Sequence, residues 1–398
     1  MFNDCYAGKR VFITGHTGFK GSWLALWLQA LGAHVYGFSL DVPTSPSLFD
    51  ALEHARVLPA WHGADMRGDL RDAHALSHAL QEAQPDIIFH LAAQAIVRKG
   101  YDQPAATFTT NALGMLNLME ALRHCPSVQA AVCITSDKCY ANPEGLWGLR
   151  ESDALGGHDP YSASKACAEH IAHAYAHSFF QKQGAAVVTA RAGNVLGGGD
   201  WGADRLVPNL ARAWFAGGIA PLRNPQGVRP WQYVLEPLAG YLWLGACLLG
   251  AADDQSFLPL SPQTGKALPR LSLCTPQHLR GQAFNFAPLP TARQTVRDIV
   301  QELRLHWHGL RVDEAPDKPV LHPHQECTLL QLNAEKALHY LGWHTVLDLS
   351  ETLRYTAEWY TALRWAAGGK QAKSMRDFSL GQIDAYAACA AWRGAPWA

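Results

Sequence analysis

A tyrosine and a lysine stand four positions apart in the segment YSASK at 161–165. The preceding Asp159-Pro160 is a typical helix start, so Tyr161 and Lys165 should project from one helical face, one turn apart. An ammonium group beside a phenol is expected to lower the phenol pKa from about 10 toward neutrality, which makes tyrosine a usable general base. The pair predicts proton removal from a hydroxyl group during its oxidation, although surface helices also produce this spacing by chance.

A second polar segment, TSDKCY at 135–140, follows an apolar run that should end at the carboxyl edge of a sheet. Ser136 would complete a Ser, Tyr, Lys trio that orients the hydroxyl group being oxidised. Elimination of water needs two further groups, an acid for the departing hydroxyl and a base for a carbon-bound proton. Asp137 and Lys138 are the candidates for these roles, and the alternative is an exposed acid-base pair in a loop.

Three glycines at spacing G-x-x-G-x-x-G follow the first apolar run and precede an amphipathic one. Such glycines permit a tight turn, and they let backbone N–H groups and a helix N-terminus approach a pyrophosphate. The alternative is an ordinary glycine-rich turn. The cofactor contacts expected from this loop come from Gly15, Thr17, Gly18, Phe19, Lys20 and Gly21.

The adenosine end of such a cofactor should lie beyond the second strand, where Ser39 stands and Asp41 follows. No Arg or Lys lies between residues 35 and 53 to bind a 2′-phosphate, which favours NAD over NADP. In GDLRD, Asp69 and Leu70 match an adenine-contacting pair, and the alternative for Asp69 is a helix cap. The segment HLAAQ at 90–94 resembles the loop that lies under such a cofactor, which implies contacts from Leu91, Ala92 and Ala93.

These residues need a scaffold of alternating strands and helices, and the first half of the chain provides that pattern. Near-continuous apolar runs predict strands at 11–14, 34–40, 86–92, 130–136 and 186–191, with helices at 20–31, 72–83, 105–124 and 161–182. This alternation indicates an α/β fold with a doubly wound, Rossmann-type parallel sheet covered on both faces. The ligand crevice of such a sheet lies at the carboxyl ends of its strands.

From residue 193 the sequence changes to Gly-, Pro- and Trp-rich loops with interspersed helices. We expect an NAD-binding domain over 1–192, to which some later segments return, and a smaller α/β substrate-binding cap over 193–370. The helices of the cap are expected at 206–216, 236–249, 291–307, 333–341 and 349–367. The proline-rich segment 252–281 is interpreted as a surface loop, and the tail 371–398 is left without a role.

Composition excludes several classes of protein. Of the 398 residues, 48% are apolar, and 33 Lys and Arg balance 34 Asp and Glu, so no global charge attracts nucleic acid or an anionic membrane. The nine cysteines are scattered without a C-x-x-C pair, which argues against a disulfide framework and against a zinc site. No apolar run is long enough for a signal peptide or a membrane span. We expect a cytoplasmic protein without a metal.

Longer motifs resemble the CDP-glucose 4,6-dehydratases, members of the extended short-chain dehydrogenase/reductases in the NAD-dependent epimerase/dehydratase family. The matching segments are GHTGFKGSWL (15–24), PTSPSLF (43–49), TSDKCYAN (135–142), GGHDPYSASK (156–165), ARAGNVLGGGDW (190–201), DRLVP (204–208), RPWQYVLEPLAGYL (229–242), LGW (341–343) and TAEWY (356–360). Motifs of this length, spread over nearly the whole chain, are far more restrictive than the glycine loop alone.

The resemblance implies a retained NAD and a CDP-glucose substrate. Tyr161 would take the 4-hydroxyl proton while hydride leaves C4, supported by Lys165 and Ser136. Asp137 would then protonate the departing 6-hydroxyl and Lys138 would remove the C5 proton, although Tyr161 could also serve as that base. Hydride return to C6 would give CDP-4-keto-6-deoxyglucose, a deoxysugar precursor of the kind used in lipopolysaccharide O-antigen. For these roles the pKa of Asp137 must rise so that it carries a proton, and the pKa of Lys138 must fall so that it is neutral. The proximity of the two charges opposes both shifts.

The substrate contacts implied by the same motifs are Gln94, Asn194, Arg205 and Arg229. Arg229 and Asn194 are assigned to the diphosphate and sugar, since arginine can bind phosphate in bidentate fashion. Tyr233 stands where the family pattern has His, and the stretch 259–276 is longer than expected. These departures put the specificity for the nucleobase and the outer rim of the pocket in question.

Quaternary structure and alternative functions complete the expectations. The resemblance implies a homodimer in which the helices at 105–124 and 161–182 form a four-helix bundle, although their apolar residues also suit a deep core. The alternative functions are another NAD-dependent nucleotide-sugar enzyme, such as an epimerase or decarboxylase, and a catalytically silent nucleotide-binding sensor. A product lighter than the substrate by one water would distinguish a dehydratase from the other enzymes and from the sensor.

Overall fold

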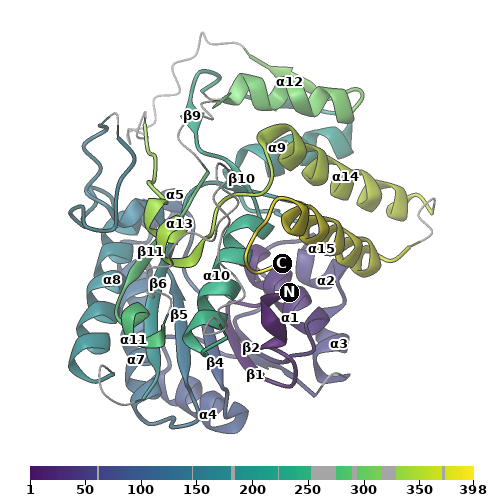
Figure 1. The fold of residues 1–398 in the computed structure, drawn as a ribbon. Coiled ribbons are helices and arrows are strands. Elements are labelled where there is room, and N and C mark those ends of the chain that lie inside the picture. The colour runs from purple at the N-terminus through teal and green to yellow at the C-terminus, as the bar shows by residue number, and fades with distance from the viewer. Residues whose placement is uncertain are drawn as a thin grey trace, which may run out of the picture.

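The computed structural model describes residues 1–60, 62–145, 147–180, 184–222, 224–251, 275–288, 294–314, 329–369 and 373–398 (Figure 1). Most of the proline-rich segment expected as a loop at 252–281 lies outside these residues. Its described end contains the short helix α11 (Pro276–Leu279).

Seven parallel strands form the central sheet, in the order β11-β6-β5-β4-β1-β2-β3. The strands predicted from the sequence are β1 (Arg10–Thr14), β2 (His34–Ser39), β4 (Ile87–His90), β5 (Ala130–Ile134) and β6 (Ala186–Ala192). Two further strands, β3 (Ala64–Arg67) and β11 (Ala283–Phe286), extend the edges. Strand order reverses between β1 and β4, so the predicted doubly wound Rossmann-type sheet is confirmed.

Helices cover both faces of the sheet. One apolar core joins α1 (Phe19–Ala30) and α10 (Leu235–Leu248) to one face, and a second joins α4 (Ala73–Ala83), α7 (Gly114–Arg123) and α8 (Pro160–Ser178) to the other. The helix predicted at 105–124 is three segments, α6 (Pro104–Phe108), a π-helical turn η2 (Thr109–Leu113) and α7. The short helices α2 (Leu48–Ala51), α3 (His54–Ala60) and α5 (Val97–Asp102) lie in connections of the dinucleotide-binding half.

The cap is built above the carboxyl edge of the sheet. It contains α9 (Leu206–Ala216), α12 (Val296–His306) and α14 (Leu349–Ala367), whereas α13 (Glu335–Leu341) packs beside β11 at the edge of the central sheet. Three two-stranded sheets connect them, and these pair β7 (Val195–Leu196) with β10 (Gln232–Tyr233), β9 (Val228–Arg229) with β12 (Gln294–Thr295), and β8 (Ile219–Pro221) with β13 (Arg311–Asp313). β11 returns from the cap region to the central sheet beside β6.

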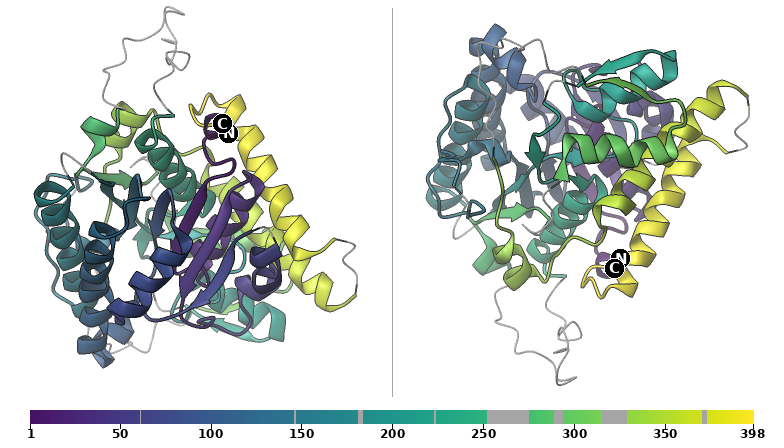
Figure 2. Two further views of the ribbon diagram at one scale, coloured as in Figure 1. Left: turned by 90° about the horizontal axis from the view of Figure 1, so that it is seen from below. Right: turned by 90° about the horizontal axis from the view of Figure 1, so that it is seen from above.

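The tail without an expected role forms a long helix, α15 (Met375–Trp392), packed against α1 and α14. Both chain ends meet there, as Figures 1 and 2 show, and the Phe2 amide donates to the Trp397 carbonyl at 2.6 Å. The Phe2 and Trp397 rings stack, and Trp27 of α1 packs edge-on against Trp397. Tyr233, which departs from the family pattern, is fully buried, and its phenol donates to Gln382 of α15 at 3.3 Å.

A buried carboxylate links α10 to the C-terminal segments. Glu236 is 0% exposed and accepts hydrogen bonds from the amides of Val346 and Leu347 and from the phenol of Tyr386. Burial outweighs these donors and raises the pKa of Glu236 to about 7. The folded protein therefore keeps a proton on this group at pH values where the unfolded chain has released it.

Glu236→Gln is expected to remove the part of the pH dependence of the free energy of unfolding that comes from this carboxyl. Between the usual carboxyl pKa of 4.5 and the folded value of about 7, the folded state binds more protons, so the free energy of unfolding falls as pH rises, by on the order of 3 kcal/mol at most. Urea unfolding of both proteins at several pH values between 5 and 8 measures this slope. Glu358→Gln, at a half-exposed carboxyl paired with Arg354, is the control. An unchanged slope in Glu236→Gln would contradict the assignment.

None of the helices in the described ranges combines the length and the apolar character needed to cross a membrane.

Candidate active site

Parallel strands bring the predicted site residues to one edge of the sheet. Ser39 ends β2, and the loops that follow β1, β4, β5 and β6 contain Gly15, Leu91, Ser136 and Asn194 respectively. Adjacent strands in this sheet share one direction, so all five residues lie at the same edge (Figure 1).

The glycine loop lies tightly between β1 and α1. Gly15 has a φ of +80°, and a Cβ there would lie 2.7 Å from the Ala92 amide nitrogen. A Cβ on Gly21 would lie 2.1 Å from the Gly15 carbonyl oxygen. Gly18 is the N-cap of α1, and no side chain caps this helix. The uncapped helix N-terminus is the feature that a pyrophosphate needs, so the loop fits a dinucleotide.

Gly18→Ala separates phosphate binding from folding. Gly18 has φ −80° and ψ 170°, which alanine adopts without strain, and the contact nearest to its Cβ would be the Gly15 carbonyl oxygen at 3.3 Å. We expect a change in unfolding free energy within about 1 kcal/mol, whereas the affinity for NAD should fall about tenfold or more because the methyl group occupies the phosphate approach. Calorimetric titration and urea unfolding measure the two effects, with Gly381→Ala on α15 as control. Unchanged NAD affinity would contradict the phosphate role.

At the expected adenosine end of the cofactor site, the glycine loop contacts Ser39 as anticipated, but a cation lies nearby that the sequence did not indicate. The Thr17 hydroxyl lies 2.8 Å from the Ser39 hydroxyl, which joins the glycine loop to the end of β2. Asp69 is engaged by the guanidinium of Arg71, and these hydrogen bonds hold its pKa below the usual value. Arg67 of β3 pairs with Ser39 in register and donates to the Leu40 carbonyl at 3.1 Å. The sequence argument that no cation lies near this position therefore missed a residue from the neighbouring strand.

Two acidic groups counter that cation. The guanidinium of Arg67 donates to Asp65 at 2.9 Å and lies 3.7 Å from Asp41. Asp65 also contacts the ring of His16, whose Nε2 lies 2.8 Å from the carboxylate. His16 is fully buried inside the glycine loop, and its ring occupies the space that a Cβ on Gly37 would need.

The loop after β4 is held by internal hydrogen bonds. The Gln94 amide donates to Asn111 Oδ1 at 2.8 Å, and Asn111 Nδ2 donates to the Ser164 hydroxyl at 2.9 Å on α8. The Gln94 side chain donates to Thr107 at 3.0 Å and accepts from the Ile96 amide at 2.6 Å. Gln94 thus shapes the loop, and Asn111 ties that loop to the helix that presents the tyrosine and lysine.

The tyrosine and lysine lie together on α8, as predicted. The Asp159 carboxylate caps the helix by accepting from the Ser162 amide at 2.9 Å. Tyr161 and Lys165 are 7% and 6% exposed. Burial raises the pKa of Tyr161 to about 12, partly offset by its hydrogen bond with Ser136. Burial also lowers the pKa of Lys165 to about 8.

The expected lowering of the tyrosine pKa by the lysine is therefore wrong for the protein by itself. The loss of hydration around the phenol outweighs the neighbouring charges. Lys165 loses hydration in the same place, and its Nζ lies 3.5 Å from the Ile134 carbonyl.

The segment after β5 forms a single 3-10 turn, η3 (Asp137–Cys139). The Ser136 hydroxyl donates to Asp137 Oδ1 at 3.0 Å and accepts from the Lys138 amide at 3.2 Å. Burial raises the pKa of Asp137, while the charge of Lys138 lowers it. The direction suits a carboxyl that must carry a proton. A Cβ on Gly193 would lie 3.3 Å from Asp137 Oδ2, so glycine there leaves room for the carboxylate.

Two additional cations contribute to the electrostatics of this site, Lys20 at Asp137 and Arg205 at Tyr161. Burial lowers the pKa of the half-buried Lys20 to about 8; the charges of Arg205 and Lys165 also lower it, and the charge of Asp137 opposes them. Arg205 forms an ion pair with Asp200 at 2.9 Å. Lys20 had been assigned to the glycine loop alone, and only the three-dimensional arrangement brings it within electrostatic range of Asp137.

The remaining predicted substrate residues are Asn194, between β6 and β7, and Arg229, on β9. Asn194 is exposed directly after Gly193, and its carbonyl accepts from the Gln232 amide at 3.1 Å. Arg229 is half-buried on β9, and its neighbour Pro230 would lie 3.7 Å from a Cβ on Gly193. Within the described residues, no group of three or more His, Cys, Asp or Glu could hold a metal ion.

Comparisons with known proteins identify relatives of this chain by sequence and by fold. The sequence profile of the GDP-mannose 4,6-dehydratase family matches residues 12–239. The chain is 40% identical over 368 residues to a CDP-glucose 4,6-dehydratase from Salmonella typhimurium, an alignment that covers 91% of this chain and 93% of the relative.

Solved structures share the fold. An epimerase, Mth375 from Methanothermobacter thermautotrophicus, superposes with a TM-score of 0.71 at 21% identity, covering 92% of this chain and 96% of that structure. DesIV from Streptomyces venezuelae, a dTDP-glucose 4,6-dehydratase with NAD and TYD bound, gives a TM-score of 0.69 at 22% identity, with coverage of 89% and 97%.

Proposed function

This chain belongs to the GDP-mannose 4,6-dehydratase family, and we propose that it dehydrates CDP-glucose to CDP-4-keto-6-deoxyglucose with NAD as its cofactor. The observation that carries the proposal is the buried acid Asp137, which lies beside Ser136 in a site that also contains Tyr161 and Lys165. Oxidation of an alcohol needs only the serine, tyrosine and lysine, whereas loss of water also needs an acid. The nucleotide and sugar follow the Salmonella relative.

The residues that would hold NAD are those of the glycine loop, Ser39 and the loop after β4. When bound, NAD would supply an acceptor and a donor of hydride, and its positive charge would favour the phenolate of Tyr161, whose pKa burial raises in the protein by itself. Tyr161 then takes the proton of the 4-hydroxyl, with Ser136 hydrogen-bonded to the phenol and Lys165 behind it.

The elimination is assigned to the two residues after Ser136. The 4-keto group acidifies the C5 proton, which Lys138 removes, and Asp137 protonates the departing 6-hydroxyl so that it leaves as water. The raised pKa of Asp137 supports its role as the acid, because burial favours the protonated carboxyl. Asn194, Arg205 and Arg229 are proposed to bind the sugar and diphosphate, and Gln94 to support them from the loop after β4.

Product mass and cofactor state together test this function. The purified protein is incubated with CDP-glucose and, separately, with UDP-glucose and dTDP-glucose. Loss of one water from CDP-glucose alone, without net reduction of NAD, is the expected result. An altered sugar of unchanged mass would instead identify an epimerase, and no turnover of any sugar nucleotide would identify a nucleotide-binding sensor.

We also propose a homodimer that forms through α7 and α8. Leu113 and Phe179 are each 49% exposed on this side of the molecule, and Leu116, Ile171 and Tyr175 are half-buried beside them. An apolar face over two adjacent helices suits a four-helix bundle between two copies. Light scattering would support this assembly with twice the mass of one chain and contradict it with a single-chain mass.

A cytoplasmic location and a place in deoxysugar biosynthesis, such as that of lipopolysaccharide O-antigen, complete the proposal. The cysteines in the described part of the chain are free thiols, which suits a reducing compartment.

A further inference from the structure

A buried ion pair joins the helix of the tyrosine and lysine to the strand next to the site. Glu169 lies on α8 one turn after Lys165, and Arg191 lies on β6. Arg191 Nε donates to Oε1 and Nη2 donates to Oε2 of Glu169, both at 2.8 Å. Each side chain is 3% exposed. Burial alone would raise the pKa of Glu169, but the bonds from Arg191 hold it below the usual value, so the pair is ionised.

The carboxylate of this pair also holds the start of the segment that bears the proposed acid. The Thr135 hydroxyl donates to Glu169 Oε1, and the Thr189 hydroxyl donates to Oε2 at 2.8 Å. Thr135 immediately precedes Ser136. The position of Ser136 is thereby tied to the helix that carries Tyr161.

The guanidinium of the pair holds the end of the same segment. Arg191 Nη1 donates to the Tyr140 phenol oxygen at 2.6 Å, and Tyr140 immediately follows η3. The Tyr140 phenol in turn donates to Asn285 Oδ1 at 2.9 Å on β11. Tyr140 and Asn285 are 2% and 0% exposed, so little room exists for an alternative arrangement.

We propose that Glu169 and Arg191 are positioning residues for the elimination, which hold both ends of the segment 135–140 and so fix Asp137 and Lys138 against Tyr161. The inference rests on the proposed function. It explains why a costly buried pair lies here, since buried ion pairs often add little net stability. Neither residue needs to touch the substrate.

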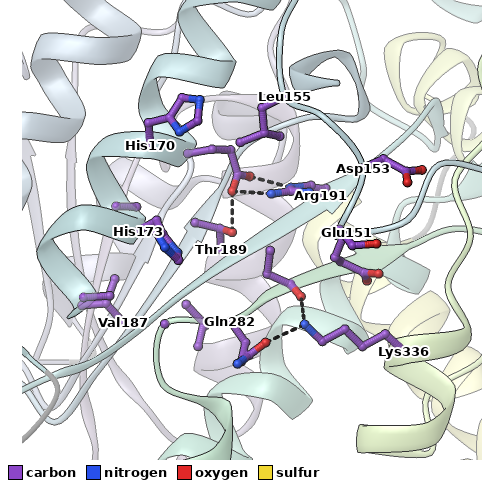
Figure 3. Close-up of a pocket in the computed structure, with 17 residues that line it drawn as sticks. Glu151, Asp153, Leu155, His170, His173, Val187, Thr189, Arg191, Gln282 and Lys336 are labelled. Atoms are coloured by element: carbon purple, nitrogen blue, oxygen red, sulfur yellow. Dashed lines mark hydrogen bonds and ion pairs between the residues drawn. The ribbon is translucent and has the colours of Figure 1, made fainter. Parts of the chain in front are cut away.

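The pair also borders a cavity of about 430 Å³ on the outer side of α8 and β6. Figure 3 shows Arg191 and Thr189 directed toward one carboxylate, with Lys336 on the opposite wall. Lys336 donates to Gln282 Oε1 at 2.8 Å and to the Ala283 carbonyl at 2.9 Å.

Arg191→Lys tests the proposal, because lysine keeps the charge but cannot hold Glu169 and Tyr140 at the same time. In the holoenzyme we expect kcat for CDP-glucose to fall about 100-fold, the effect of a displacement of roughly 1 Å in a reacting group. KM for CDP-glucose should stay within about threefold, since no substrate contact is removed. Amide hydrogen exchange should quicken in residues 136–140 and stay unchanged in β1 and β2.

Glu236→Gln is the matched control, a change at a second buried carboxylate that holds Val346 and Leu347 far along the chain from the segment 135–140. It should leave kcat unchanged, whereas Glu169→Gln should behave like Arg191→Lys. If the single variants do not fold, Glu169→Met combined with Arg191→Met replaces the pair by apolar side chains. The double variant should regain cooperative unfolding but not kcat.

The outcomes separate this inference from the proposed function. If the unaltered protein dehydrates CDP-glucose and Arg191→Lys, or the folded double variant, retains its kcat, positioning by the pair is wrong. Unchanged amide exchange in 136–140 together with a lower kcat would also overturn it. Failure of the unaltered protein to dehydrate any sugar nucleotide would instead reject the proposed function.

Discussion

Tyr161→Phe is expected to lower kcat for CDP-glucose dehydration by about 1,000-fold, the contribution of a well-placed general base. The phenol is the group that hydrogen-bonds to Ser136, and phenylalanine keeps the ring while removing the only proton acceptor at that position of α8. Because Tyr161 is 7% exposed and packs near Gly100, the ring itself should keep the fold intact.

Stopped reactions analysed by mass spectrometry measure this loss, and calorimetry with CDP-glucose should show binding changed less than tenfold if the loss lies in the chemical step. Tyr355→Phe is the matched control, because that phenol belongs to a ring of α14 that packs against Tyr233 and has no assigned role in the reaction. A Tyr161→Phe enzyme with kcat within tenfold of the unaltered protein would show that another group takes the 4-hydroxyl proton.

Asp137→Asn is expected to stop the reaction between oxidation and water loss. The amide is nearly the same size and can still bond to Ser136, but it cannot give a proton to the departing hydroxyl. We expect formation of the 6-deoxy product to fall by about 100- to 1,000-fold, whereas removal of hydrogen from C4 continues. Reduced nicotinamide should then accumulate on the enzyme after mixing with CDP-glucose.

Absorbance of reduced nicotinamide and product mass, followed together, check this result. Asp86→Asn is the control and should turn over normally. Asp86 pairs with Lys9 at 3.6 Å and accepts from the Arg10 amide at the amino end of β1, away from the site. Loss of product without accumulated reduced cofactor would place the defect before elimination. Full dehydration by Asp137→Asn would remove Asp137 from the acid role.

Much of the fold follows from local patterns. The five strands predicted from apolar runs are all present, because buried parallel strands have no polar face to interrupt the run. β3 was missed because its four residues include Asp65 and Arg67, whose side chains contact each other at the edge of the sheet. β11 was missed because only pairing with β6 identifies its short sequence as a strand.

The C-terminal helix α15 could not be predicted from the sequence for a different reason. Its sequence is rich in small residues without a clear helical period, so nothing local indicates its burial. Its buried face is defined by α1 and α14, which come from distant parts of the chain. Contacts of this kind are a property of the assembled core rather than of a sequence window.

The residues of the candidate site likewise fall into those that a local motif identifies and those that only the folded structure brings together. Ser136, Asp137, Tyr161 and Lys165 could be found because each follows a strand or starts a helix in a recognisable motif. Glu169 and Arg191 could not, since an isolated Glu and Arg carry no signal until β6 lies beside α8. The direction of the Tyr161 pKa was also beyond a local reading, because it depends on how much of the surrounding chain excludes water.

The meeting of the two chain ends has a consequence for how the protein is made. Trp27, in the helix that begins at the glycine loop, is covered by Tyr386 and Trp397. During synthesis the first Rossmann elements leave the ribosome hundreds of residues before this cover exists, so α1 keeps an apolar face open until α15 and the residues after it have been made. A nascent chain stalled before residue 375 should therefore depend on chaperones that shield that face.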